Sequence, residues 1–304
     1  MNDITGGWSG FMWTGVILGT LGAISSETWP CIWIIIELNL MSFLPAITAK
    51  WRTKKITILY FIVQRIGSLA ILTRVGSDKS GIVMKWLMIG LLMKAALAPF
   101  HFWGPIVLVN LSKGTSFLLL TWQKVAPLFL LLLTTNRNHL ICILLCNAVV
   151  SSICGIGAKD ILVLLFFSRL SHMCWVMSAP YIRACKYFLL YSFSVAPIFL
   201  FSYLYIPILI LNIAGLPPIT GFLLKLGVIQ MIDLRLTFVL LLSSVPLLFA
   251  YCRLFLFSVR KGVFDVWCVL SCGLGIIYYK KSYESVQLLI GHYSYINVLL
   301  PTTS

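Results

Sequence analysis

TSFLLLTWQKVAPLFLLLL, residues 115–133, is a stretch of 19 residues in which Lys124 carries the only charge. A helix needs about 20 consecutive apolar residues to cross the hydrocarbon core of a bilayer. The stretch therefore has the length and hydrophobicity of a transmembrane helix, with one ammonium group at its midpoint. A charge at that depth is costly, so either the segment lies outside a membrane or Lys124 has a function.

The rest of the chain has the same character as this stretch. Of its 304 residues, 60% are hydrophobic and only 10% are charged, whereas a soluble domain of that length needs much more polar surface. Peptide groups in hydrocarbon must form their hydrogen bonds internally, so each span is expected to be helical. We therefore predict an all-α membrane protein with about 10–11 transmembrane helices, at residues 8–25, 29–49, 56–74, 82–103, 115–133, 139–157, 161–179, 184–205, 207–232, 236–258 and 264–279.

Two of these spans contain helix-breaking residues. One includes KAALAPFHFWGP (94–105) and the other NIAGLPPITGFLLK (212–225), and prolines in such positions break or kink a helix. Broken helices at corresponding places in two halves are typical of transporters built from inverted repeats, although a kink that serves only packing is an alternative. The expected arrangement is one polytopic domain over residues 1–304. Its first half-repeat covers about 8–133, its second about 139–258, and a C-terminal helix and tail cover 259–304.

The charge balance is strongly basic, with 23 Lys and Arg against 8 Asp and Glu and a formal net charge of +15. Much of the excess lies in short loops such as KWRTKK (50–55), where anionic headgroups favour it. We therefore exclude nucleic acid as a partner. The first ten residues, MNDITGGWSG, lack the basic start of a secretory signal and the Arg-rich character of an import presequence. This predicts that the chain is inserted through its own spans or is made in the compartment where it works.

The cysteines do not indicate a metal or cluster site. None of the nine forms a C-x-x-C motif, and pairs such as Cys142 and Cys146 lie four residues apart within apolar runs. Metal sites use tighter ligand groupings with loop geometry. We interpret the cysteines as small apolar residues at helix contacts, and we expect the chain to bind no cofactor and no metal.

Four ionisable residues lie deep within predicted spans: Glu37, Lys94, Lys124 and Lys225. Each costs at least about 2.5–3.5 kcal/mol near the bilayer centre unless it faces the bundle interior, meets water or pairs. Glu37 and Lys94 are the natural ion pair, while the two other lysines have no evident acidic partner. Removing an ammonium group from water without a counter-charge favours its neutral form, so we interpret these lysines as proton carriers. A purely structural Glu37–Lys94 pair is the alternative.

Two histidines are secondary relay candidates. His172 lies beside Arg169 in FFSRLSHMCWVM (166–177), and its side chain titrates near neutral pH, although a helix–helix contact would explain it equally well. His101 lies near the break of its span, where packing is the simpler interpretation. Arg65 is interpreted as an interface anchor.

Several motifs resemble one family in the same order along the chain. They are ELNLMSFLPAI (37–47), YFIVQ (60–64), KAALAPFHFWGP (94–105), LLLTWQKVAP (118–127), SHMCW (171–175) and AGLPPITGFLLKLGVIQ (214–230). Together they closely resemble subunit 2 of respiratory NADH:ubiquinone oxidoreductase (complex I), over about residues 15–255. The chain departs from the family's pattern at Ile106, Arg169, Cys174 and Met231.

The resemblance implies an antiporter-like, proton-pumping subunit of the complex I membrane arm. By motif, Glu37 and Lys94 match the family's glutamate–lysine pair, Lys124 its central lysine, and Lys225 the lysine after the second broken helix. It also implies a multi-pass protein of the mitochondrial inner membrane that is a subunit of an H⁺-translocating NADH:ubiquinone reductase. Its partners would be other membrane-arm subunits, including neighbouring antiporter-like ones, and lipids, with cardiolipin as a candidate. NADH, FMN, iron–sulfur clusters and ubiquinone would be bound by other subunits, with no redox centre in this chain.

Two other functions remain open from the sequence. One is a subunit of a multisubunit cation/proton antiporter, whose chains usually carry additional N-terminal helices. The other is a scaffold that joins membrane subunits and moves no protons, for which neutralising Lys124 would leave pumping intact.

Overall fold

The structure is a computed structural model that describes residues 4–48, 54–75, 81–200, 206–215 and 220–259. Within these ranges the regular elements are all helices, with no strand. They are α1 (Ile4–Ser25), α2 (Trp29–Thr48), α3 (Lys54–Leu72), α4 (Gly81–Ala95), α5 (Trp103–Val109), α6 (Lys113–Leu120), the 3₁₀ turn η2 (Trp122–Lys124), α7 (Val125–Thr134), α8 (Arg137–Gly157), α9 (Ile161–Ser178), α10 (Tyr181–Leu200), α11 (Ile206–Ala214), α12 (Thr220–Ile229) and α13 (Leu234–Val259).

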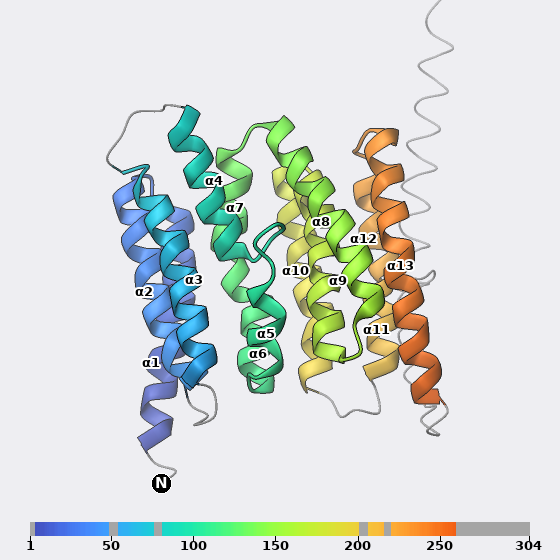
Figure 1. The fold of residues 1–304 in the computed structure, drawn as a ribbon, viewed down its shortest axis with the longest axis horizontal. Helices are drawn as coiled ribbons and strands as arrows, with labels where there is room; N and C mark the ends of the chain where they lie inside the picture. The colour runs from blue at the N-terminus through green and yellow to red at the C-terminus, as the bar shows by residue number, and fades with distance from the viewer. Residues whose placement is uncertain (1–3, 49–53, 76–80, 201–205, 216–219, 260–304) are drawn as a thin grey trace, which may run out of the picture.

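The helices stand side by side with similar axis directions and run across the molecule from α1 to α13 (Figure 1). Six segments of the described ranges are long and apolar enough to cross a membrane, which confirms the predicted all-α membrane fold. They are Trp29–Thr48, Lys54–Leu72, Lys113–Thr134, Arg137–Gly157, Ile161–Ser178 and Leu234–Leu254. The predicted span at 264–279 lies outside the described residues.

The distribution of polarity is that of a membrane protein. Large apolar side chains such as Ile62, Val149 and Phe193 are exposed on the outer surface, at 50%, 55% and 71%. Charged side chains such as Lys124 and Arg169 are buried inside. Because an apolar exterior fits lipid or neighbouring apolar subunits, the bundle is built to be surrounded by them rather than by water.

Helix α9 is the most enclosed element of the bundle. Every residue from Leu164 to Met177 is buried, so the helix has no exposed face over most of its length. It packs against α5 of the first half of the chain and against α8, α10 and α13 of the second. A helix that is covered all round touches both halves, and its polar side chains must find partners there.

The two predicted helix breaks are present. The first separates α4 from α5 and lies at mid-height of the bundle beside α8 and α9 (Figure 1). The second separates α11 from α12, with residues 216–219 outside the described ranges.

A third interruption was not predicted. The span at 115–133 consists of α6, the 3₁₀ turn η2 and α7, and Lys124 lies at the junction of η2 and α7. Pro127 occupies the first turn of α7, where its missing N–H and fixed φ are tolerated, so a new helix starts just before it. Pro105 has the same position in α5.

Candidate functional site

The broken end of α4 has the geometry of a Schellman motif. Ala96 has a φ of 53°, in the left-handed region that usually holds glycine. Its N–H donates to the carbonyl of Met93 at 3.2 Å, and the N–H of Leu97 donates to the carbonyl of Leu92 at 3.1 Å. The motif uses only those two carbonyls, so the carbonyls of Lys94, Ala95 and Ala96 have no partner within the helix. We call these three carbonyls the α4 end.

Two buried cations from other helices bind the α4 end. The Nζ of Lys124 donates to the carbonyl of Lys94 at 3.0 Å. The guanidinium of Arg169 donates to the carbonyls of Ala95 and Ala96, at 3.0 and 3.2 Å. Since a helix carries partial negative charge at its C-terminus, cations are the partners that its last carbonyls favour. Lys124 also lies over the ring of Trp103, 4.6 Å from its centroid.

The broken end of α11 repeats this chemistry. Gly215, with a φ of 75°, follows the helix, and its N–H bonds back into the last turn. The Nζ of Lys225 donates to the carbonyl of Ala214 at 2.7 Å, and the Nε2 of His172 lies 3.1 Å from the carbonyl of Ile213. We call the carbonyls of Ile213 and Ala214 the α11 end. Each broken helix therefore ends in a left-handed residue and carbonyls that face a lysine.

The contacts of His172 define its tautomer. A carbonyl oxygen only accepts, so Nε2 must carry the proton toward Ile213. In the neutral ring Nδ1 then accepts from the hydroxyl of Tyr187, at 2.9 Å. The ring also stacks against Tyr191, with 4.6 Å between centroids. Both ring nitrogens are therefore engaged, and one of them joins α9 to the α11 end.

The predicted direct ion pair between Glu37 and Lys94 is wrong. The Oε2 of Glu37 lies 2.6 Å from the Nη1 of Arg65, so its partner comes from α3 and not from α4. Arg65 lies near the middle of α3 and contacts a carboxylate, which the interpretation of this residue as an interface anchor did not anticipate. Its side chain is 35% exposed and that of Glu37 is 11% exposed. Glu37 and Arg65 are nevertheless both near enough to Lys94 to act on it through their charges.

A small cavity lies beside Lys94, and neither Glu37 nor Arg65 is among its lining residues. Its volume is about 20 Å³, enough for about one water molecule. Asn39, Gln64 and Gln123 contribute amide groups to its wall, and Tyr60 contributes a phenol. The amide of Gln123 also donates to the Oδ1 of Asn39 at 3.1 Å, which fixes the residue before Lys124 against α2.

His101 is placed less favourably for a relay. It lies in the break between α4 and α5, and its ring packs edge-on against Phe167 with 6.3 Å between centroids. Its Nδ1 has no hydrogen-bond partner within the part of the chain that the structure describes. Its relay role therefore stays a prediction.

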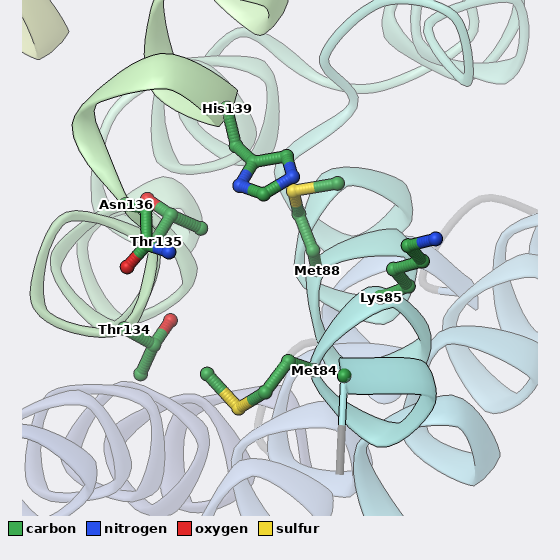
Figure 2. Close-up of a pocket in the computed structure, with 8 residues that line it drawn as sticks. Met84, Lys85, Met88, Thr134, Thr135, Asn136 and His139 are labelled. Carbon is green, nitrogen blue, oxygen red and sulfur yellow. The ribbon is translucent and has the colours of Figure 1, made fainter. Parts of the chain in front are cut away.

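Two larger cavities lie away from the lysines named above. One, of about 230 Å³, lies where the start of α4 approaches the turn between α7 and α8, and Figure 2 shows the imidazole of His139 turned toward the thioether of Met88 there. The other, of about 410 Å³, lies between α1, α6, α7 and α10, and its wall is mostly apolar. None of Glu37, Lys94, Lys124 and Lys225 lines either cavity.

The chain is similar to known proteins. A family model described as NADH:quinone oxidoreductase/Mrp antiporter, TM, matches residues 73–206. NADH-ubiquinone oxidoreductase chain 2 of Lumbricus terrestris is 28% identical over 80% of this chain and 84% of its own length. The chain 2 protein of Aedes aegypti is 31% identical over 79% of this chain and 82% of its own length.

The chain belongs to the NADH-ubiquinone oxidoreductase chain 2 family.

Solved structures share the fold of this chain. A chain of respiratory complex I from Thermus thermophilus with bound Aureothin superposes with a TM-score of 0.70 at 21% identity, covering 79% of this chain and 68% of that one. A chain of the Mrp complex from Dietzia superposes with a TM-score of 0.65 at 14% identity, covering 78% of this chain and 58% of that one. The antiporter-like fold that the family resemblance implies is thereby confirmed.

In this chain 2 protein, the residues that sequence reasoning missed are polar side chains that bind Glu37 or the first helix break. Arg65 was assigned to the interface, Arg169 was noted only as a departure, and Asn147 was not singled out. Asn147 is fully buried on α8, and its Oδ1 accepts from the N–H of Ala98 in the first break at 2.9 Å. The available signal was the position of Asn147 and Arg169 near the middle of apolar spans, where polar side chains need a partner.

Proposed function

We propose that this chain is a membrane-arm subunit of respiratory complex I that takes part in proton translocation coupled to NADH oxidation and ubiquinone reduction. Glu37, Lys94, Lys124 and Lys225 carry the protons, with His172 and His101 as further relay candidates. The proposal is supported by family membership and by the location of Lys124 and Lys225 on the carbonyls of broken helix ends. Discontinuous helices of this kind form ion sites in transporters.

The broken ends suit a lysine that gains and loses a proton. An ammonium group and a neutral amine can both donate to a carbonyl, so Lys124 stays on the α4 end in either state. When the proton leaves, the nitrogen gains a lone pair and becomes an acceptor for the next donor. The lysine can therefore exchange protons without losing its position.

In the first half of the chain, Glu37 would be the charged group that changes position. Its carboxylate pairs with Arg65 and also acts on Lys94 through space. Movement of the carboxylate from Arg65 toward Lys94 would favour the charged form of that lysine, and return to Arg65 would favour proton release. The cavity beside Lys94 has room for about one water molecule, which would give that lysine a partner for proton exchange.

The proposed setting follows from the family. The chain would lie in the mitochondrial inner membrane with other membrane-arm subunits and lipids as neighbours. NADH, FMN, iron–sulfur clusters and ubiquinone would be bound elsewhere in the complex. The two half-repeats, about 8–133 and 139–258, are supported by the similar position of the broken helix in each.

The test compares Lys124→Ala with Lys124→Arg in the assembled complex. Both variants should lower the number of protons moved per NADH oxidised, because alanine carries no proton and arginine does not release one. Lys85→Ala removes an exposed lysine of α4 and should leave the ratio unchanged. A wild-type ratio in assembled Lys124→Ala would instead support the scaffold function.

A further inference from the structure

Arg169 is a buried charge that the proton relay above does not use. It lies in the middle of α9 and is fully buried. Its guanidinium lies 4.8 Å from the centroid of the Phe166 ring and donates to two carbonyls of the α4 end. Such a burial is costly unless the charge is well bonded, so the contact with α4 is a strong constraint on both helices.

No carboxylate balances this guanidinium within the described ranges. The ion pairs found there are Glu37 with Arg65 and Arg137 with Asp233. Arg169 is instead stabilised by carbonyl dipoles at a helix C-terminus and by an aromatic face. Removing the charge would therefore leave the carbonyls of Ala95 and Ala96 buried and unpaired, which is costly in its own right.

Lysine and arginine have different roles at the α4 end. Three successive carbonyls bind two cations, Lys124 on the first and Arg169 on the next two. A guanidinium keeps its charge under all physiological conditions, whereas a lysine can lose its proton. Arg169 can thus hold the helix end in place in every protonation state of Lys124.

Helix α9 also reaches the second broken end. His172 follows Arg169 by three residues, so the two side chains lie on neighbouring positions of the helix surface. Arg169 bonds the α4 end, and His172 bonds the carbonyl of Ile213 at the α11 end. One rigid helical turn therefore links the two helix ends that face Lys124 and Lys225.

We propose that Arg169 is a positioning residue: a permanent cation of the second half that fixes the broken end of α4 in the first half, and so keeps Lys124 in place for proton transfer. The same turn of α9 carries this constraint to the α11 end. The inference rests on the proposed function, because it assigns Arg169 to the transfer that Lys124 would perform.

The test uses the assembled complex with one of two substitutions. Arg169→Met keeps a long side chain but removes the charge. Arg169→Lys keeps a positive charge but lacks the planar guanidinium that donates to both carbonyls. We expect Arg169→Met to slow proton transport about tenfold at an equal amount of complex, since a displacement of about 1 Å can cost on the order of 100-fold. Arg169→Lys should recover part of the loss, a rescue that a packing role would not produce. Arg253→Met is the matched control, because Arg253 donates to the carbonyl of Ala158 at the end of α8.

The outcomes separate the two proposals. Wild-type proton transport in assembled Arg169→Met would overturn the inference. If that variant does not assemble, Arg169→Gln, which also lacks the charge, is tested in its place, and wild-type transport in Arg169→Gln would overturn the inference. A structure of the Arg169→Met complex supplies a readout independent of pumping: we expect the contact between Lys124 and the Lys94 carbonyl to be lost. If that contact is lost while Lys124→Ala pumps normally, Arg169 positions the lysine and only the proposed function fails.

Discussion

Glu37 and Arg65 form the one ion pair, within the described ranges, that lies between two spans of the first half. The carboxylate is mostly buried and the arginine is partly exposed. The pair is therefore intermediate between an exposed and a fully buried salt bridge. Arg65 thus supplies a counter-charge to a carboxylate that lies near enough to Lys94 to act on it.

For single residues we predict that each single substitution of the pair lowers the thermal stability of the complex more than the double substitution does. Glu37→Gln leaves Arg65 without its carboxylate, and Arg65→Met leaves Glu37 as an unpaired charge, whereas the double variant removes both charges. A double-mutant cycle on the thermal stability of the assembled complex should give a coupling of about 0.5–3 kcal/mol. Additive effects would show that the two side chains do not stabilise each other.

Sequence reasoning identified the charged residues but not all of their partners. Lys94 and Lys124 were predicted to be buried because their spans are apolar on both sides, and they are. Their carbonyl partners could not be predicted, because which carbonyls a helix leaves unpaired depends on where it ends. Glu37 pairs with Arg65 because of how α3 is oriented about its own axis relative to α2. That orientation cannot be predicted from a local sequence pattern.

Among the elements, α3 and α4 are joined by close approach of two glycines. A Cβ on Gly90 would lie 2.6 Å from the carbonyl oxygen of Gly67 and 3.0 Å from the Cβ of Ala70. The obstacle is backbone, which cannot rotate away. The small residues let α4 lie near enough to α3 for Lys94 to be influenced by Arg65.

Gly90→Ala should therefore destabilise the bundle by about 1–3 kcal/mol through overpacking. The measurement is the thermal stability and yield of the assembled complex. Gly114→Ala in α6 is the control, because a Cβ there meets nothing within 4 Å, so it should be neutral or mildly stabilising. Equal effects of the two variants would contradict the close approach.

The turn η2 gives a prediction about Lys124. Pro127→Ala restores an N–H and removes the clash that ends a preceding helix, so α6 and α7 should join more regularly. The backbone rotation should move the Nζ of Lys124 from the Lys94 carbonyl and lower the protons moved per NADH oxidised. Pro197→Ala, inside α10, is the control and should leave that ratio unchanged. Loss of activity in both would indicate a general requirement for proline.

Element positions were predictable because hydrophobic length and helix breakers are local signals. Breaks with two or more prolines or glycines were recognised, at 94–105 and 212–225. The break at η2 was missed because a single proline at 127 was interpreted as part of a continuous apolar span. Pro45 and Pro246 lie inside unbroken helices, so a single proline in the sequence does not establish that a helix is broken.

For the whole molecule, the apolar exterior predicts the effect of a charge placed on it. Ile62 lies near the middle of α3 and is 50% exposed on the outer surface. Ile62→Asp should disfavour membrane insertion by about 3 kcal/mol. The measurement is the amount of full-length chain in alkali-washed membranes, with Ile62→Leu as the control. Unchanged insertion of Ile62→Asp would mean that this surface does not face lipid.

The contacts that complete the first break come from residues far ahead in the chain. Ala95 and Ala96 are bonded by Arg169, and the N–H of Ala98 is bonded by Asn147. A ribosome makes the chain from its N-terminus, so these peptide groups enter the bilayer before their partners have been synthesised. Until α8 and α9 arrive, water or an insertase must solvate them, because bare peptide groups in hydrocarbon are costly. Biogenesis of the early helices thus depends on translation of the later ones.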